Sequence, residues 1–149
     1  MAASCESIIN FLITVKSKLH ELYLSYYRNT QKPGLKKLLL SMIDQEKEQE
    51  KALHDFKKEY NLNTIFLAKS LEDINLDNYK ISRKYSREME YRDFLLFIIE
   101  QKEKSVQLYK KLIEKTSNID IKYFFSQLSD ETNKHKTWAQ DRYDLDMLA

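Results

Sequence analysis

The chain has almost none of the residues that form tight turns, since its 149 residues include one Gly and one Pro. Gly adopts backbone conformations that other residues avoid, and Pro presets turn geometry, so the chain has few means of making the tight turns that a sheet needs. Long uninterrupted helices are favoured instead. The single cysteine, Cys5, cannot form an intramolecular disulfide, which is typical of a reducing compartment.

Long apolar runs and an excess of charge of one sign are also lacking. The longest early apolar stretch, 8–15, contains Asn10 and has no basic segment before it, so we predict neither a signal peptide nor a membrane span. The 25 basic and 23 acidic residues leave a net charge of +2, which gives no reason to expect nucleic acid or a membrane as partner. The 42% hydrophobic and 32% charged residues are typical of a soluble globular protein. We expect one cytoplasmic domain, residues 1–149.

What the sequence does contain is an internal repeat. Residues 8–58 align without a gap on residues 94–144, and Lys16 matches Lys102 (102 − 16 = 86). Each copy has the apolar periodicity of a helical hairpin. Two copies therefore predict an all-α four-helix bundle with pseudo-twofold symmetry.

The apolar seams and turn residues divide this bundle into three parts. We predict hairpin one over about 4–60, with Ser4 or Ser7 as the first N-cap, and hairpin two over about 86–144. Residues 61–85 are too many for a bare loop, so they are expected to form a long crossover that contains a short helix. The later helices are predicted over about 35–60, 86–115 and 120–143. The seam of each helix is the stripe of residues expected to face the core: Ile8, Leu12, Val15, Leu19, Leu22 and Tyr26 in the first, Leu35, Leu39, Met42, Glu46, Gln49, Leu53 and Phe56 in the second, Leu95, Ile98, Lys102, Ser105 and Tyr109 in the third, and Ile121, Phe125, Leu128, Thr132, His135 and Ala139 in the fourth.

Six polar residues interrupt the apolar seams at corresponding levels of the four helices. Charged residues are rarely left inside a bundle unless they are paired. We therefore predict a buried polar cluster near the midpoint of the bundle. The six residues are Lys16, Glu46, Gln49, Lys102, Thr132 and His135.

The pattern around these residues matches a known motif. Tyr23 and Tyr109 each follow a seam lysine by seven residues, and the partner helices carry Glu46-Lys47-Glu48-Gln49 and Thr132-Asn133-Lys134-His135. In these features both hairpins resemble rubrerythrin-type members of the ferritin-like superfamily. The resemblance implies a ferritin-like bundle of two hairpins joined by a long crossover. It also implies a di-iron centre, held in the family by one Glu before each Tyr and a Glu-x-x-His in each partner helix.

This chain keeps few of those ligands. Lys16 and Lys102 stand where the family has Glu, and of the six expected ligands only Glu46 and His135 remain. Ammonium groups repel metal ions and cannot coordinate them while protonated. We therefore expect the di-iron site to be lost and no metal or cofactor to be bound. If a metal ion is bound, we expect a single iron or manganese ion held by Glu46, His135, Glu131 and Gln49.

The lysines can be placed in two ways. In the first, Lys16 and Lys102 replace the metal cations, Glu46 is their shared counter-ion and Glu131 is a second anion. In the second, both lysines lie at the edge of the seam and extend their ammonium groups into solvent. We favour the first, because the same residue type recurs at equivalent repeat positions.

Three classes of function remain. We favour a non-catalytic ferritin-like, rubrerythrin-related scaffold or interaction protein that has lost its di-iron site, with a homodimer as a candidate assembly. The alternative is a residual metal-binding protein in metal handling or peroxide defence, which would be an oxidoreductase of rubrerythrin type. The third uses a lysine of lowered pKa as a nucleophile. The first class predicts purified protein without metal and without peroxidase or ferroxidase turnover.

Overall fold

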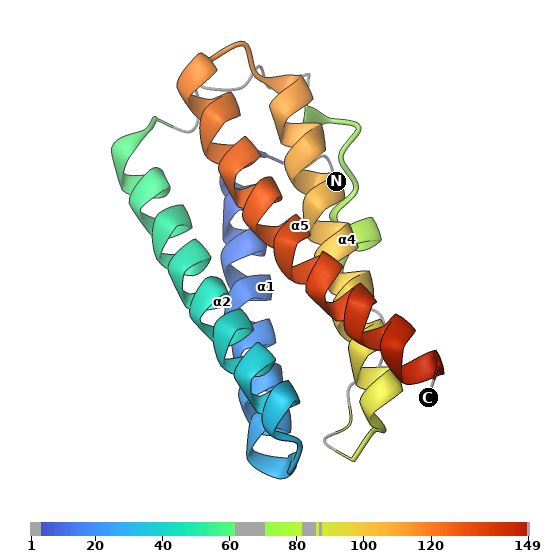
Figure 1. Cartoon of the computed structure of the whole chain (residues 1–149). Coiled ribbons are helices and arrows are strands. Elements are labelled where there is room, and N and C mark those ends of the chain that lie inside the picture. The colour runs from blue at the N-terminus through green and yellow to red at the C-terminus, as the bar shows by residue number, and fades with distance from the viewer. Residues whose placement is uncertain (1–3, 62–70, 82–85, 87, 149) are drawn as a thin grey trace.

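The computed structural model describes residues 4–61, 71–81, 86 and 88–148. This part of the chain is helical, without a strand, so the predicted all-α four-helix bundle is confirmed (Figure 1). None of its helices is both long enough and apolar enough to cross a membrane. The long helices are α1 (Cys5–Asn29), α2 (Pro33–Glu59), α4 (Tyr91–Lys115) and α5 (Ile119–Leu148), and a 3₁₀ helix, η2 (Leu76–Tyr79), lies between α2 and α4 along the chain.

The start of α1 uses both of the predicted capping residues. Ser4 is the N-cap, and its hydroxyl accepts a hydrogen bond from the Ser7 backbone N–H at 3.1 Å. The Ser7 hydroxyl in turn accepts one from the Ser4 N–H at 2.8 Å. Two N–H groups that the helix itself leaves unpaired are thus satisfied. The next helix opens with Pro33 in its first turn, where the missing N–H costs nothing.

Two helix ends differ from their predicted positions. Helix α4 begins at Tyr91 rather than near Ser86, because the preceding turn is held from outside: the Tyr26 hydroxyl donates to the Met89 carbonyl at 3.0 Å. Helix α5 continues to Leu148 instead of ending near 143. Its last turn is tied to α4 by an ion pair between Arg92 and Asp146 at 3.4 Å.

Helices α2 and α4 start at the same end of the bundle, so the chain must cross its length between them (Figure 1). Figure 1 shows α1 antiparallel to α2 and α4 antiparallel to α5, while α2 and α4 run in the same direction. In the described part of the predicted crossover, the 3₁₀ helix η2 packs against α4. Leu71 and Ile74 bury their side chains in the core, and Lys115 binds Asp73 at 2.9 Å. Residues 62–70 and 82–85 of the predicted crossover lie outside the described residues.

The core consists of two apolar clusters, one toward each end of the bundle. Leu12 of α1 and Leu108 of α4 belong to the first cluster, and Leu19 and Ile98 of the same helices belong to the second. On α2, α4 and α5 every predicted seam residue is buried. On α1 the expected seam residues Val15 and Leu22 are only half-buried, since Lys16 and Tyr23 take the innermost places.

Candidate functional site: a buried Lys–Glu–Lys cluster

A layer of polar side chains separates the two apolar clusters. On α1, Lys16 lies between Leu12 and Leu19, and on α4 Lys102 lies between Ile98 and Leu108. Helix α2 contributes residues to the same level between Ile43 and Leu53, and α5 between Leu128 and Ala139. All six predicted cluster residues are buried: Lys16, Glu46, Gln49, Lys102, Thr132 and His135.

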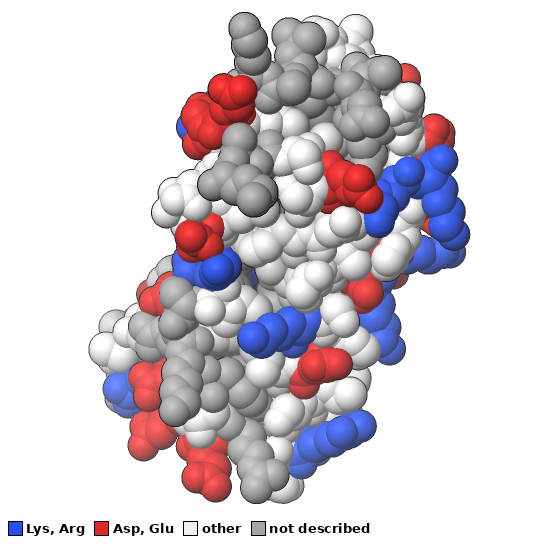
Figure 2. Space-filling view, turned by 180° about the vertical axis from the view of Figure 1, so that it is seen from behind, with Lys and Arg blue, Asp and Glu red and all other residues white. Residues whose placement is uncertain are grey.

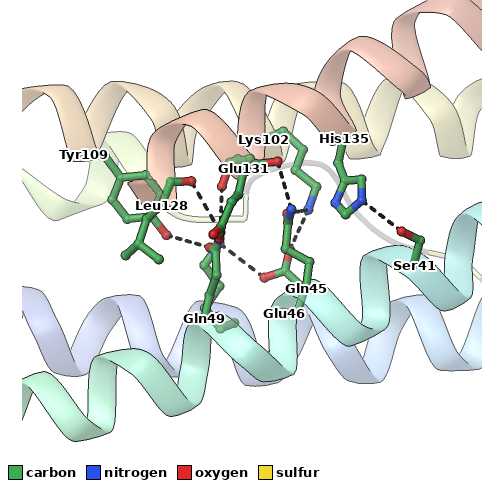
Figure 3. Close-up of polar contacts among 11 residues, drawn as sticks. Ser41, Gln45, Glu46, Gln49, Lys102, Tyr109, Leu128, Glu131 and His135 are labelled. Carbon is green, nitrogen blue, oxygen red and sulfur yellow. Dashed lines mark hydrogen bonds and ion pairs between the residues drawn. The ribbon is translucent and has the colours of Figure 1, made fainter. Parts of the chain in front are cut away.

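Both lysines point inward. Their exposed fractions are 0% for Lys16 and 1% for Lys102, so neither ammonium group reaches solvent along its stem. The Glu46 carboxylate lies between them: Oε1 is 2.6 Å from the Lys102 Nζ atom, and Oε2 is 3.2 Å from that of Lys16. Lys102 also donates to the Gln45 side-chain oxygen at 3.1 Å (Figure 3). Two cations thus share one fully buried carboxylate.

The pKa values follow from burial and from these contacts. Burial raises the pKa of Glu46, but the nearby Lys102 and Lys16 charges lower it by a larger amount, so the net shift is downward. Glu46 is therefore an ionised carboxylate. Burial lowers the pKa of Lys102, and its attraction to Glu46 opposes that shift only in part.

Each ammonium group also faces a tyrosine ring of the other hairpin. The Lys16 Nζ atom is 5.6 Å from the Tyr109 ring centroid, and the Lys102 Nζ atom is 5.6 Å from that of Tyr23. Cations are attracted to the electron-rich faces of aromatic rings at this distance. Burial raises the pKa of both tyrosines, so they remain neutral phenols.

Side-chain amides tie α2 to α5 beside the charged cluster. The Gln49 amide nitrogen donates to the Thr132 hydroxyl at 3.2 Å. The Tyr109 hydroxyl donates to the Gln49 amide oxygen at 3.1 Å (Figure 3). Gln45 donates to the Glu131 carbonyl at 2.8 Å. Gln45 was not among the predicted site residues. Its repeat equivalent is Glu131, which was predicted, and that correspondence was the signal available for finding it.

His135 lies at the side of the layer near Trp138. Its Nε2 atom is 3.0 Å from the Ser41 hydroxyl, a partner that the sequence did not reveal. Burial and the Lys102 charge lower the pKa of His135 to about 4, so the ring is neutral at physiological pH. The Trp138 ring lies beside it, with ring centroids 5.4 Å apart.

Glu131 does not have its predicted role as a second anion of the cluster. It is exposed, and no ion pair joins it to Lys16 or Lys102 in the described part of the chain. Its carboxylate instead lies 3.4 Å from the Gln49 amide nitrogen. The physical reason is its position on α5, one residue before the buried Thr132, which directs it outward.

The donor set does not fit the di-iron centre that the resemblance implies. The best surviving ligand, Glu46, has an ammonium group against each carboxylate oxygen. The Nε2 atom of His135 is bonded to Ser41, and an amide and a hydroxyl replace ligands at Gln49 and Thr132. Across the described ranges, no three His, Cys, Asp or Glu residues are grouped closely enough to hold a metal ion.

Comparison of the chain with family models, curated proteins and solved structures gave no match in any of the three. The ferritin-like resemblance therefore depends on the residues described above.

Proposed function

We propose that this protein is a ferritin-like, rubrerythrin-related bundle in which a Lys–Glu–Lys cluster has replaced the di-iron site. On this proposal it acts through its surface, as a scaffold or interaction protein, and not through redox chemistry. One observation carries the proposal. The Glu46 carboxylate contacts Lys102 at 2.6 Å and Lys16 at 3.2 Å, where the resemblance expects carboxylates around metal ions.

The replacement of two metal ions by two lysine ammonium groups is electrostatically consistent. A di-iron centre places two cations among carboxylates, and here two ammonium groups occupy the core with one carboxylate between them. Two like charges about 4 Å apart repel by roughly 4 kcal/mol at an effective dielectric of 20, so Glu46 is needed to hold them together. A further metal cation would add to that repulsion.

The ferritin-like relationship is supported by contacts that the repeat relates to each other. The Lys16–Tyr109 and Lys102–Tyr23 contacts exchange under the offset between the two copies, and both are 5.6 Å long. Helices α2 and α4 run in the same direction, which requires the long crossover of that superfamily. The lysine-nucleophile hypothesis is disfavoured, because a carbonyl substrate has no access to ammonium groups that are 0% and 1% exposed.

Elemental analysis tests the proposal. Protein expressed in medium replete with iron and manganese is expected to contain far less than one metal ion per chain and to show no peroxidase or ferroxidase turnover. The matched comparison is a variant with Lys16→Glu, Gln49→His, Lys102→Glu and Thr132→Glu, which restores the family ligands and is expected to retain metal. Near-stoichiometric metal in the parent, lost in both Glu46→Ala and His135→Ala, would establish the residual metalloprotein instead.

A further inference from the structure

Helices α2 and α5 present a face with a hollow at each end. In Figure 1 these two helices lie toward the viewer, with α1 behind them. One hollow, of about 480 Å³, lies between the C-terminal half of α2 and the N-terminal half of α5. The other, of about 510 Å³, lies between the N-terminal half of α2 and the C-terminal half of α5. The hydrogen bonds from Gln45 and Ser41 to α5 lie between them.

The two hollows have opposite charge. The first is lined by Glu48, Asp120 and Glu131 and by no basic side chain of the described residues. The second is lined by Lys37 and Arg142, with one acidic residue, Asp141, over a mainly apolar floor. On the opposite side of the molecule, shown in Figure 2, basic and acidic side chains are interspersed rather than gathered at separate ends.

Large apolar side chains are exposed beside both hollows. Tyr123, at the acidic hollow, is 65% exposed. Trp138 and Leu145, at the basic hollow, are 52% and 63% exposed. An exposed apolar surface rimmed by charged groups is typical of a protein–protein contact.

The spacing of these residues makes the face complementary to itself. In a face-to-face dimer the twofold axis lies in the plane of the interface. An axis that runs across α2 and α5 places each helix antiparallel to its own copy, and it pairs residues that lie symmetrically about one level of that helix. On α5, Asp120 and Arg142 are centred on position 131, and Tyr123 and Trp138 on position 130.5.

The same axis relates the charged residues of α2. Lys37 and Glu48 are centred on position 42.5 of α2. The Gln45–Glu131 and Ser41–His135 bonds place that level beside about position 133.5 of α5. The centres therefore agree within about three residues, or roughly 4.5 Å of helix rise.

We propose that the α2–α5 face is a homodimer interface on which a second copy of this chain binds antiparallel. In this arrangement Glu48 and Asp120 of each copy face the partner's Lys37 and Arg142, and Trp138 packs against the partner's Tyr123. The face extends about 33 Å from Asp120 to Arg142, and two helix diameters make it about 20 Å wide. Its area of roughly 650 Å² approaches the 800 Å² or so that each partner buries in a standard interface.

In this dimer a second copy of the chain is the partner for the proposed surface role. The functional meaning of the dimer depends on the proposed function, but its formation does not. Metal content and oligomeric state are to be measured on the same sample. Bound metal in a dimer would contradict the proposed function alone, whereas a metal-free monomer would contradict the dimer alone.

Light scattering and sedimentation of the full chain test the assembly directly. We expect a concentration-dependent dimer that weakens as salt is added, because exposed charges are screened. Trp138, the one tryptophan of the chain, is a built-in probe, and its emission is expected to shift to shorter wavelength as the dimer forms. A chain that stays monomeric from micromolar to millimolar concentration overturns the proposal.

Charge-reversal variants test whether the α2–α5 face is the dimer interface. One variant carries Lys37→Glu and Arg142→Glu, and a second carries Glu48→Lys and Asp120→Lys; all four native residues are exposed, so folding is expected to be retained. Each variant has two hollows of one sign, and its self-association is expected to weaken at least about tenfold. Mixing the two is expected to form a heterodimer, because both contacts then join opposite charges.

The matched control is Lys47→Glu with Lys51→Glu, the same change of charge on exposed α2 residues that line neither hollow. It is expected to dimerise like the parent. The proposed interface is wrong if the two exchanged variants still dimerise separately, or if mixing them restores nothing.

Discussion

At the scale of single residues, Glu46 is the side chain on which the core depends most. Three ionisable groups are buried there, and such a cluster adds little net stability because each group loses its hydration. Removing one member is costly all the same, since the charges left behind stay buried without compensation. Glu46 is the sole carboxylate within ion-pair distance of Lys16 and Lys102 among the described residues.

Replacing that carboxylate should therefore destabilise the protein strongly. Glu46→Leu is expected to lower the free energy of unfolding by about 3–5 kcal/mol, because two ammonium groups then face each other in the core. Urea unfolding followed by circular dichroism measures the loss. Asp44→Leu, a change at an exposed acidic residue of the same helix that lines neither hollow, should shift the free energy by no more than about 0.5 kcal/mol. A neutral or stabilising Glu46→Leu would mean that the lysines are solvated after all.

His135 should make the stability of the protein depend on pH between about 4 and 6.5. Its pKa in the folded state is about 4, below its ordinary value of 6.5, so between these values the unfolded chain binds more protons. Stability is therefore fully present above pH 6.5 and is lost as pH falls toward 4, by at most about 3 kcal/mol.

Urea midpoints at several pH values between 7 and 4 test this dependence. His135→Gln should flatten the profile relative to the parent, because it removes the titrating group. His54→Gln is the control, since the His54 side chain is exposed and pairs with Glu50 at the surface, and it should keep the parent slope. Identical slopes in all three proteins would show that His135 is not the group responsible.

The burial of the polar cluster could be predicted from the sequence because its residues interrupt an apolar pattern. A lysine at a seam position is conspicuous, and Lys16 and Lys102 both lie inside the bundle. Gln45 and Ser41 were missed because neither lies on a predicted seam. Their roles depend on contacts with α5, 86 and 94 residues away along the chain.

At the scale of helices, the interior pattern could be predicted better than the ends. Seam positions follow from the helical period alone, and on α2, α4 and α5 they were all buried. The start of α4 could not be predicted, because the turn before it is held by Tyr26 from a distant helix. Helix ends that are fixed by tertiary contacts leave little trace in the local sequence.

The start of α2 offers a test of backbone entropy. Gly34 has no positive φ angle, so an alanine fits its backbone and should stabilise the protein by about 0.4–1 kcal/mol through the unfolded state. The added Cβ atom would meet the Arg142 guanidinium, the flexible end of a side chain, which must move aside. In the parent the net gain should therefore be smaller than this range.

A double-mutant cycle separates the two effects. Gly34→Ala should give its full gain in an Arg142→Ala background, where nothing obstructs the new methyl group. Thermal or urea unfolding of the four proteins measures both terms. Equal effects of Gly34→Ala in the two backgrounds would show that Arg142 yields at no cost.

At the scale of the whole molecule, a polar layer divides the core. One apolar cluster includes Leu12 and Leu108, the other includes Leu19 and Ile98, and the charged residues lie between them. A bundle with an unbroken apolar core would tolerate sliding of its helices more easily. A buried cluster with one matched arrangement restricts the register, in the way that single polar residues do in coiled coils.

Removing the whole layer of charge tests this division of roles between stability and specificity. A variant with Lys16→Met, Glu46→Leu and Lys102→Met leaves no buried charge in the cluster and joins the two apolar clusters. It is expected to match the parent or exceed it by about 1–4 kcal/mol in unfolding free energy, although it contains the same change that destabilises Glu46→Leu. If it proved as unstable as the single variant, lost packing at Glu46 would explain both. If it is stable but shows broadened side-chain resonances, the charges serve to select one packing arrangement, and their cost in stability is the cost of that selection.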